Sequence, residues 1–267
     1  MDSSTTGKSD FQSLIDAENA NFVATTTILG KTVESVQDFQ DLYQSLADFI
    51  RISGNGITPE QKKVAFCTLH LLMKCRGDLL LGGLNLVRGY QGDSLRFLRA
   101  AIEACAFAAK IKRHPPFADV WLNAVDSDTD YKTFKEKFKR LFPPDDAGLQ
   151  ELRECYDHCS QMIHNSVYAM SGHFSHRRDG TSQHVRFNVF DLPDGPLVGA
   201  ALYFTLDAHK RILKKFAEVL AGNIRVDRQV WAIRYNSVEA KLDVHRERWK
   251  AVIPDPRRTV GGTDETS

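Results

Sequence analysis

Apolar residues recur at helical spacing along most of the chain. Between Asp10 and Ile52 one seam repeats every seven residues, at Ile15, Phe22, Leu29, Val36, Tyr43 and Ile50. The second seam position is polar early (Glu18, Thr25, Thr32) and apolar later (Phe39, Leu46). This pattern predicts a long N-terminal helix lying on the rest of the fold, with a dimerising coiled coil as the alternative. Gly30 is a candidate bend.

Further helices follow from the same periodicity. The segment Pro59–Val87 is apolar almost all round its second half, so we expect it to be the most buried helix, with Thr58 as N-cap. Shorter amphipathic stretches predict helices over 94–112, 116–125, 130–142 and 149–170, and two more over 196–221 and 227–252. Only Val185, Phe187 and Val189 alternate with polar residues as in a strand.

The pattern therefore predicts an all-α fold, a multi-helix bundle with at most one short strand or hairpin near 183–191. We expect one helical domain over 10–253, flanked by disordered residues 1–9 and 254–267. Its predicted parts are a long N-terminal helix (10–57), a core (58–170), a loop and strand (171–192) and C-terminal helices (193–253).

Composition and charge point to an ordinary globular protein. The 267 residues are 26% charged with a formal net charge of +1, which gives no global drive toward nucleic acid or membrane. The five cysteines, Cys67, Cys75, Cys105, Cys155 and Cys159, are odd in number and lie within apolar helical patterns. We expect reduced, buried thiols in a cytoplasmic protein. Neither a signal peptide nor an apolar run that could span a bilayer is visible, so we expect no membrane association.

Two predicted helices carry polar groups beside their apolar stripes. Tyr156, Ser160 and His164 are four residues apart and form a ridge on the 149–170 helix. Arg99 and Glu103, also four apart, edge the stripe of the 94–112 helix. A buried arginine and glutamate need partners, so we predict a polar network between these two helices.

These motifs carry a resemblance. "LRAAIEACAFAAKI" followed about fifty residues later by "CYDHCSQMIHNS" resembles a family of uncharacterised helical proteins with an Arg-x-x-x-Glu helix before a Tyr-x-x-x-Ser-x-x-x-His helix. That family is distantly similar to the HEPN superfamily, and the match covers roughly Thr58 to Met170. The resemblance implies a homodimeric helical bundle that binds or cleaves RNA in a bacterial defence or toxin–antitoxin context. An antitoxin or another protein partner is a further implication.

Members of the superfamily that cleave RNA do so without a metal, using an arginine followed by a histidine. Arg153 and His158 have that spacing here, but on one continuous helix they diverge by about 140°. His164 lies on the Arg153 edge instead, about 16 Å further along the axis. The resemblance and the ridge together give these catalytic candidates: His164, Arg99, Glu103, Tyr156, Ser160, Arg153 and His158. A histidine would move the proton and an arginine would stabilise charge on the phosphate.

Other polar clusters are candidates for RNA contact. His173, His176, Arg177 and Arg178 follow the ridge helix and are candidate phosphate ligands. Two basic stretches, the Lys132–Lys135–Lys139 face and "HKRILKK" from His209 to Lys215, are also candidates, with a solvated charged face as the alternative. Cys155, His158 and Cys159, completed by His70 or Cys67, would make a zinc site, but buried thiols are the simpler interpretation. We expect no metal and no cofactor.

The alternative function is a non-catalytic interaction or scaffold protein. In that case the polar residues on the two helices would form a buried structural network rather than an active site. Burial of His164 against Arg99 or Glu103 would favour the structural alternative, and an open cleft beside His164 would favour RNA.

Overall fold

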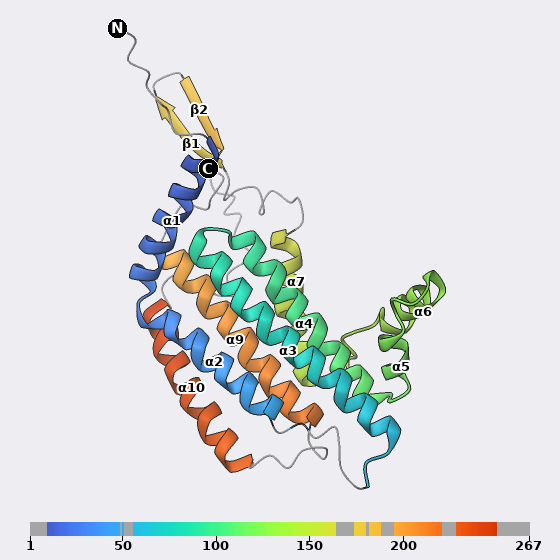
Figure 1. Ribbon diagram of the computed structural model, residues 1–267. Helices are drawn as coiled ribbons and strands as arrows, with labels where there is room; N and C mark the ends of the chain where they lie inside the picture. Colours follow the sequence, from blue (N-terminus) through green and yellow to red (C-terminus); the bar gives the residue numbers. More distant parts are fainter. Residues whose placement is uncertain are drawn as a thin grey trace, which may run out of the picture.

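Two long helices joined by a tight turn form the centre of the protein. In the computed structural model, α3 runs Pro59–Arg88 and α4 runs Gln91–Arg113, and they pack along their length (Figure 1). The structure describes residues 10–48, 50, 56–163, 174–179, 182–187, 195–220 and 228–249. Gly89 makes the turn with φ at +90°, a left-handed conformation that favours glycine. Gly82 allows close approach, because a Cβ there would lie 3.4 Å from Phe97 Cβ.

The start of α3 confirms the predicted cap. The side chain of Thr58 accepts a hydrogen bond from the amide of Gln61 at 3.2 Å, and the amide of Thr58 donates to Gln61 Oε1 at 2.9 Å. This reciprocal pair is a capping box, which satisfies two amides at the helix N-terminus. The predicted burial of the later part of α3 holds for one face, where Leu72, Cys75 and Leu79 are fully shielded from solvent. The opposite face is open, since Leu80 and Leu81 are 54% and 44% exposed.

The other helices surround this central pair in an all-α bundle, as predicted. They are α1 (Asp10–Leu29), α2 (Lys31–Asp48), α7 (Ala147–Ile163), α9 (Gly195–Leu220) and α10 (Arg228–Trp249). Helices α7 and α9 pack on α4, while α2 lies against α3, α9 and α10. Buried side chains from all of these helices except α1's first turns belong to one hydrophobic core.

The predicted long N-terminal helix is divided in two at Gly30. This glycine has φ at +52°, its amide donates to the Thr26 carbonyl, and its own carbonyl accepts from the amide of Val33. The chain therefore changes direction between α1 and α2, at the predicted bend. The seam is buried only in its later part: Leu29 and Tyr43 are shielded, whereas Phe22 is 40% exposed.

Short helices α5 (Phe117–Leu122) and α6 (Asp128–Phe138) stand apart from the bundle on one side (Figure 1). We call residues 117–139, which end at the C-cap of α6, the arm. Aromatic rings attach it to α4: Phe107 lies 5.2 Å from Phe138 and 5.6 Å from Phe134, measured between ring centroids. These edge-to-face contacts are favourable and fix the position of α6 at its C-terminal end.

The predicted strand is one half of a hairpin. Strands β1 (Phe174–Asp179) and β2 (Ser182–Phe187) pair antiparallel, with His176 opposite Val185 and Arg177 opposite His184. The predicted disordered ends, 1–9 and 254–267, lie outside the described residues. Among the helices that are described, none has the length and apolar character needed to cross a bilayer. All five cysteines are buried and unpaired, as predicted.

Candidate functional site

The predicted network between α4 and α7 is present for three of its residues. Arg99 Nη2 donates to the hydroxyl of Tyr156 at 2.8 Å, and that hydroxyl donates to Glu103 Oε1 at 2.9 Å. Arg99 Nε lies 3.4 Å from the same carboxylate oxygen, and the guanidinium sits 4.8 Å above the Tyr156 ring. The Arg99 and Glu103 side chains are 29% and 32% exposed, so the group is neither sealed nor fully open. Its charges neutralise each other.

The remaining helical candidates do not join this group. Ser160 donates to the backbone carbonyl of Tyr156 at 2.9 Å, a bond within its own helix. Arg153 forms a 3.6 Å ion pair with Asp157, and both side chains are more than half exposed. The ring of His158 lies 5.0 Å from that of Phe204 on α9. Partial burial there lowers the pKa of His158 below its ordinary value.

Several candidates lie where the structure gives no side chains. His164 and His173 fall outside the described residues, so the predicted contact of His164 with Arg99 or Glu103 stays a prediction. His176, Arg177 and Arg178 are residues of β1, but only the backbone of that strand is described. Their roles as RNA ligands stay predictions as well.

The two basic stretches identified in the sequence differ sharply in their surroundings. In the 209–215 stretch, His209 is fully buried and its Nδ1 is hydrogen-bonded to the Tyr43 hydroxyl at 2.7 Å. Three other cations there are ion-paired: Lys210 with Asp207 and Glu239, Arg211 with Asp207 and Glu151, and Lys215 with Asp146 and Glu218. Most of this stretch is therefore neutralised within the fold.

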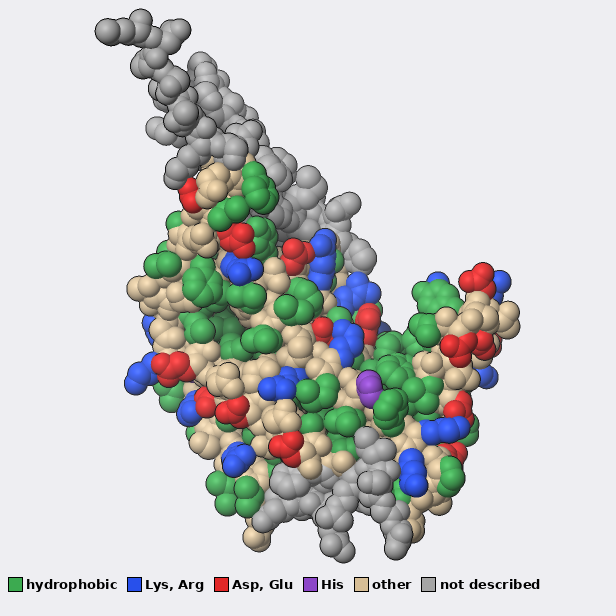
Figure 2. All heavy atoms as spheres, viewed as in Figure 1, with side chains coloured by type: hydrophobic (Ala, Val, Ile, Leu, Met, Phe, Trp, Pro, Cys, Tyr) green, Lys and Arg blue, Asp and Glu red, His purple; other side chains and the backbone are tan. Residues whose placement is uncertain are grey.

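The lysines of the arm are different. Lys132, Lys135 and Lys139 are exposed, and no carboxylate within the described ranges forms an ion pair with them. Lys135 lies 4.5 Å above the Tyr131 ring. On the face shown in Figure 2, Lys and Arg side chains are interspersed with Asp and Glu, on the arm as well as on the bundle. The α6 lysines thus form no ion pair in the described part of the chain, although Asp128, Asp130 and Glu136 lie on the same helix.

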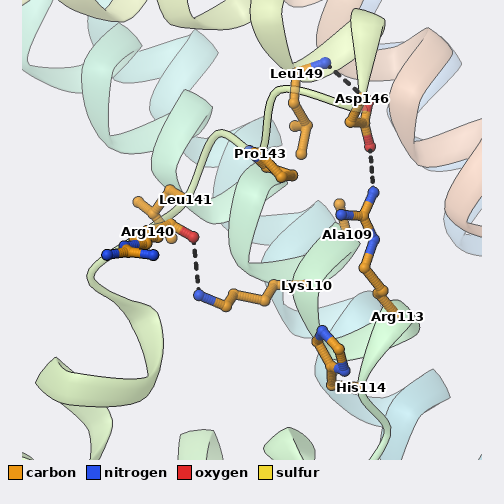
Figure 3. Close-up of a pocket in the computed structure, with 9 residues that line it drawn as sticks. All are labelled: Ala109, Lys110, Arg113, His114, Arg140, Leu141, Pro143, Asp146 and Leu149. Atoms are coloured by element: carbon orange, nitrogen blue, oxygen red, sulfur yellow. Dashed lines mark hydrogen bonds and ion pairs between the residues drawn. The ribbon is translucent and has the colours of Figure 1, made fainter.

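A pocket opens where the arm returns to the bundle, and the sequence did not point to it. Its volume is about 200 Å³. Helix α4, the connection between α6 and α7, and the first turn of α7 line it (Figure 3). Its lining combines ionisable residues with apolar ones: Lys110, Arg113, His114, Arg140 and Asp146, and Ala109, Leu141, Pro143 and Leu149.

Hydrogen bonds tie the pocket's walls together. Lys110 Nζ donates to the Arg140 carbonyl at 2.8 Å, which joins α4 to the connection (Figure 3). Arg113 Nη2 reaches Asp146 Oδ2 at 3.4 Å, a long contact. Asp146 has shorter partners, since Lys215 Nζ and the amide of Leu149 donate to it at 2.8 and 3.0 Å. Although burial acts to raise it, these hydrogen bonds hold the pKa of Asp146 below its ordinary value.

The pocket concentrates positive charge without an equal negative charge. Burial, and then the nearby charge of Arg140, lower the pKa of Lys110. No carboxylate in the described part of the chain forms an ion pair with Lys110 or Arg140. Lys110, Arg113 and His114 come from the last turn of α4 and its C-cap, whereas Arg140 comes from the connection after α6, so the site forms only where these two segments meet.

No group of three or more His, Cys, Asp or Glu side chains suited to a metal is present among the residues that the structure describes. Cys155 and Cys159 are buried against the core instead. Searches against protein-family models, curated proteins and solved structures found no match for this chain.

Proposed function

We propose that this protein binds single-stranded RNA on the surface formed by the arm and the end of α4. The proposal rests on one observation. The α6 lysines form no ion pair in the described part of the chain, whereas Lys210, Arg211 and Lys215 in the 209–215 stretch are ion-paired. Lysines that are not neutralised internally remain available for the phosphates of a polyanion. The sequence resemblance to HEPN-like proteins supports RNA as the polyanion.

Charge and shape at this end of the protein are compatible with that ligand. Lys110 and Arg140 continue the positive surface from α6 toward α4, where the Lys110–Arg140 hydrogen bond joins the two segments. His114 is exposed, with its ring 5.2 Å from that of Phe117. Exposed rings beside cations are the usual means by which proteins hold unpaired bases, since every base has a face that can stack.

The proposal is tested by the salt dependence of RNA binding. Fluorescence anisotropy of a labelled mixed-sequence RNA gives Kd at several salt concentrations. Replacing Lys132 and Lys139 together by Gln should weaken binding at least several-fold. It should also reduce the slope of log Kd against log salt by about 0.7 for each phosphate contact removed.

A matched control carries the same loss of charge elsewhere. Lys31 on α2 and Arg246 on α10 are exposed and have no ion pair within the described ranges. The Lys31→Gln, Arg246→Gln double variant should bind RNA as the wild type does. Equal weakening by both double variants would indicate nonspecific attraction and contradict the proposed surface. Binding to single-stranded DNA with the same affinity would contradict the assignment to RNA.

A metal-independent endoribonuclease is a second candidate, and exposed His158 is the observation that favours it. Its lowered pKa keeps the ring neutral near pH 7, so it can accept a proton. The Arg153–Asp157 pair on the same helix, with Arg153 turned about 140° from His158, is a solvent-screened surface pair that a phosphate can displace. Cleavage of labelled RNA should be lost in His158→Ala or His164→Ala, with the fold checked by circular dichroism. A wild type that leaves RNA intact would exclude this candidate.

A further inference from the structure

The pocket between α4 and the α6–α7 connection has the character of an anion site. We infer that it binds a phosphate monoester and, resting on the proposed function, that this group is the terminal phosphate of a bound RNA. The inference depends on three features of the pocket: its excess charge, its size and the free donors on its walls.

The excess charge matches a dianion. Three cationic side chains, Lys110, Arg113 and Arg140, line the pocket against the single carboxylate of Asp146, before His114 is counted. Asp146 is paired with Lys215 and Arg113 with Asp145, so Lys110 and Arg140 remain as the two lining cations without a carboxylate partner among the described residues. The pocket is therefore short of about two negative charges. A phosphate monoester carries roughly −1.5 to −2 at pH 7, whereas a backbone diester carries only one negative charge.

The size of the pocket favours one compact group. A volume of about 200 Å³ is smaller than the cavities, roughly 300 Å³ and upward, that enclose whole drug-sized ligands. It holds a phosphate and part of the sugar attached to it, while the rest of the ligand lies outside. An internal phosphate would need chain to leave in two directions. A terminal phosphate needs only one exit.

The walls supply donors that are not used up within the fold. Lys110 spends one of its three protons on the Arg140 carbonyl, so two remain. The bonds from Arg113 to Asp145 and Asp146 are 3.3 and 3.4 Å long, so they are easily exchanged for shorter bonds to phosphate oxygens. The apolar lining residues Leu141, Pro143 and Leu149 limit water and strengthen these charge interactions.

Two matched RNA oligonucleotides, one with a 5′-phosphate and one with a 5′-hydroxyl, test the inference by anisotropy. A second pair carries a 3′-phosphate or a 3′-hydroxyl. The wild type should bind one phosphorylated member roughly tenfold more tightly than its partner, as expected for charge-assisted hydrogen bonds. Lys110→Met should remove that preference. Lys112→Met, two residues further along α4 and outside the pocket lining, should retain it.

A small probe separates the pocket from RNA binding as a whole. Adenosine 5′-monophosphate, followed by ³¹P NMR, should bind the wild type and Lys112→Met but neither Lys110→Met nor Arg140→Gln. Thermal unfolding of each variant checks that the fold is intact. If the nucleotide binds in this pattern and RNA does not, the inferred site stands and the proposed function fails. If RNA binds regardless of its terminal phosphates and the nucleotide does not bind, the inference is overturned and the proposed function stands.

Discussion

The hydroxyl of Tyr43 lies 2.7 Å from Nδ1 of His209, and both side chains are completely shielded from solvent. The other ring nitrogen of His209 has no hydrogen-bond partner among the described residues. Burial lowers the pKa of His209 to about 3 and raises that of Tyr43 well above its ordinary value. Both groups are therefore neutral at physiological pH, and the pair is a structural contact between α2 and α9.

This pair predicts a pH-dependent stability. An unfolded histidine has a pKa near 6.5, so between about pH 6.5 and 3 the unfolded state binds a proton that folded His209 does not. The stabilisation is complete above pH 6.5 and is lost as pH falls, by about 1.4 kcal/mol for each pH unit. Urea unfolding at pH 7.0, 6.0 and 5.0 measures it. The double variant Tyr43→Phe, His209→Leu should show a smaller slope, and an unchanged slope would contradict the assignment.

Removing the Tyr156 hydroxyl from the Arg99–Glu103–Tyr156 group should lower the stability of the protein and leave its binding of RNA unchanged. Tyr156→Phe removes the hydroxyl that accepts from Arg99 and donates to Glu103, which should lower the free energy of unfolding by about 1 kcal/mol or more. Tyr131→Phe is the control: Tyr131 is exposed and its hydroxyl forms no hydrogen bond with the described residues, so stability should be unchanged. Urea unfolding and RNA anisotropy of both variants provide the test. A Tyr156→Phe protein of normal stability that fails to bind RNA would make this group part of the site.

Replacing glycine by alanine should destabilise the protein at Gly199 and stabilise it at Gly77. A Cβ at Gly199 would lie 2.4 Å from the Trp249 ring, so Gly199→Ala forces α9 and α10 apart and should cost about 1–3 kcal/mol. Gly77 on α3 has open space at its Cβ position. There the usual helix preference for alanine should stabilise by up to about 1 kcal/mol. Thermal unfolding gives the melting temperature of both variants. If both melting temperatures shift in the same direction, the close approach of Gly199 to Trp249 is absent.

The buried thiols predict slow chemical labelling of the native protein. Burial raises the pKa of Cys67 and of Cys155 to about 11 and that of Cys159 to about 12, which leaves almost no thiolate at pH 8. Reaction with Ellman's reagent should be slow in buffer and should release the signal of all five cysteines in denaturant. A rapid native reaction of one thiol would mean that its surroundings open without global unfolding.

The contacts that sequence predicted are those between groups at regular helical spacing. Arg99 and Glu103 are four residues apart, so the helical period of 3.6 residues places both on one side of α4, where they face Tyr156. The cap at Thr58 and the break at Gly30 were likewise local, since one residue type at one position determines each of them.

Contacts that depend on how distant segments meet could not be predicted in this way. Thr32 was a polar position in the predicted seam, yet it is buried, as is Ser35, and both are hydrogen-bonded to His245, more than two hundred residues later. The pocket was missed for the same reason. Lys110 and Arg140 come together because Lys110 Nζ donates a hydrogen bond to the backbone carbonyl of Arg140 in the connection after α6. The residue spacing within either segment does not predict that hydrogen bond.

The position of α10 beside α2 also determines the order in which this chain can fold. Besides the His245 bonds, Lys241 pairs with Asp38 at 2.8 Å, and Arg248 donates to the carbonyls of Ile28 and Leu29 at the α1–α2 break. During synthesis, the polar face of α2 therefore emerges long before its partners exist. The first helices of the protein reach their final environment only after the last described helix has been made, so a ribosome-bound fragment that lacks α10 should expose this face to chaperones.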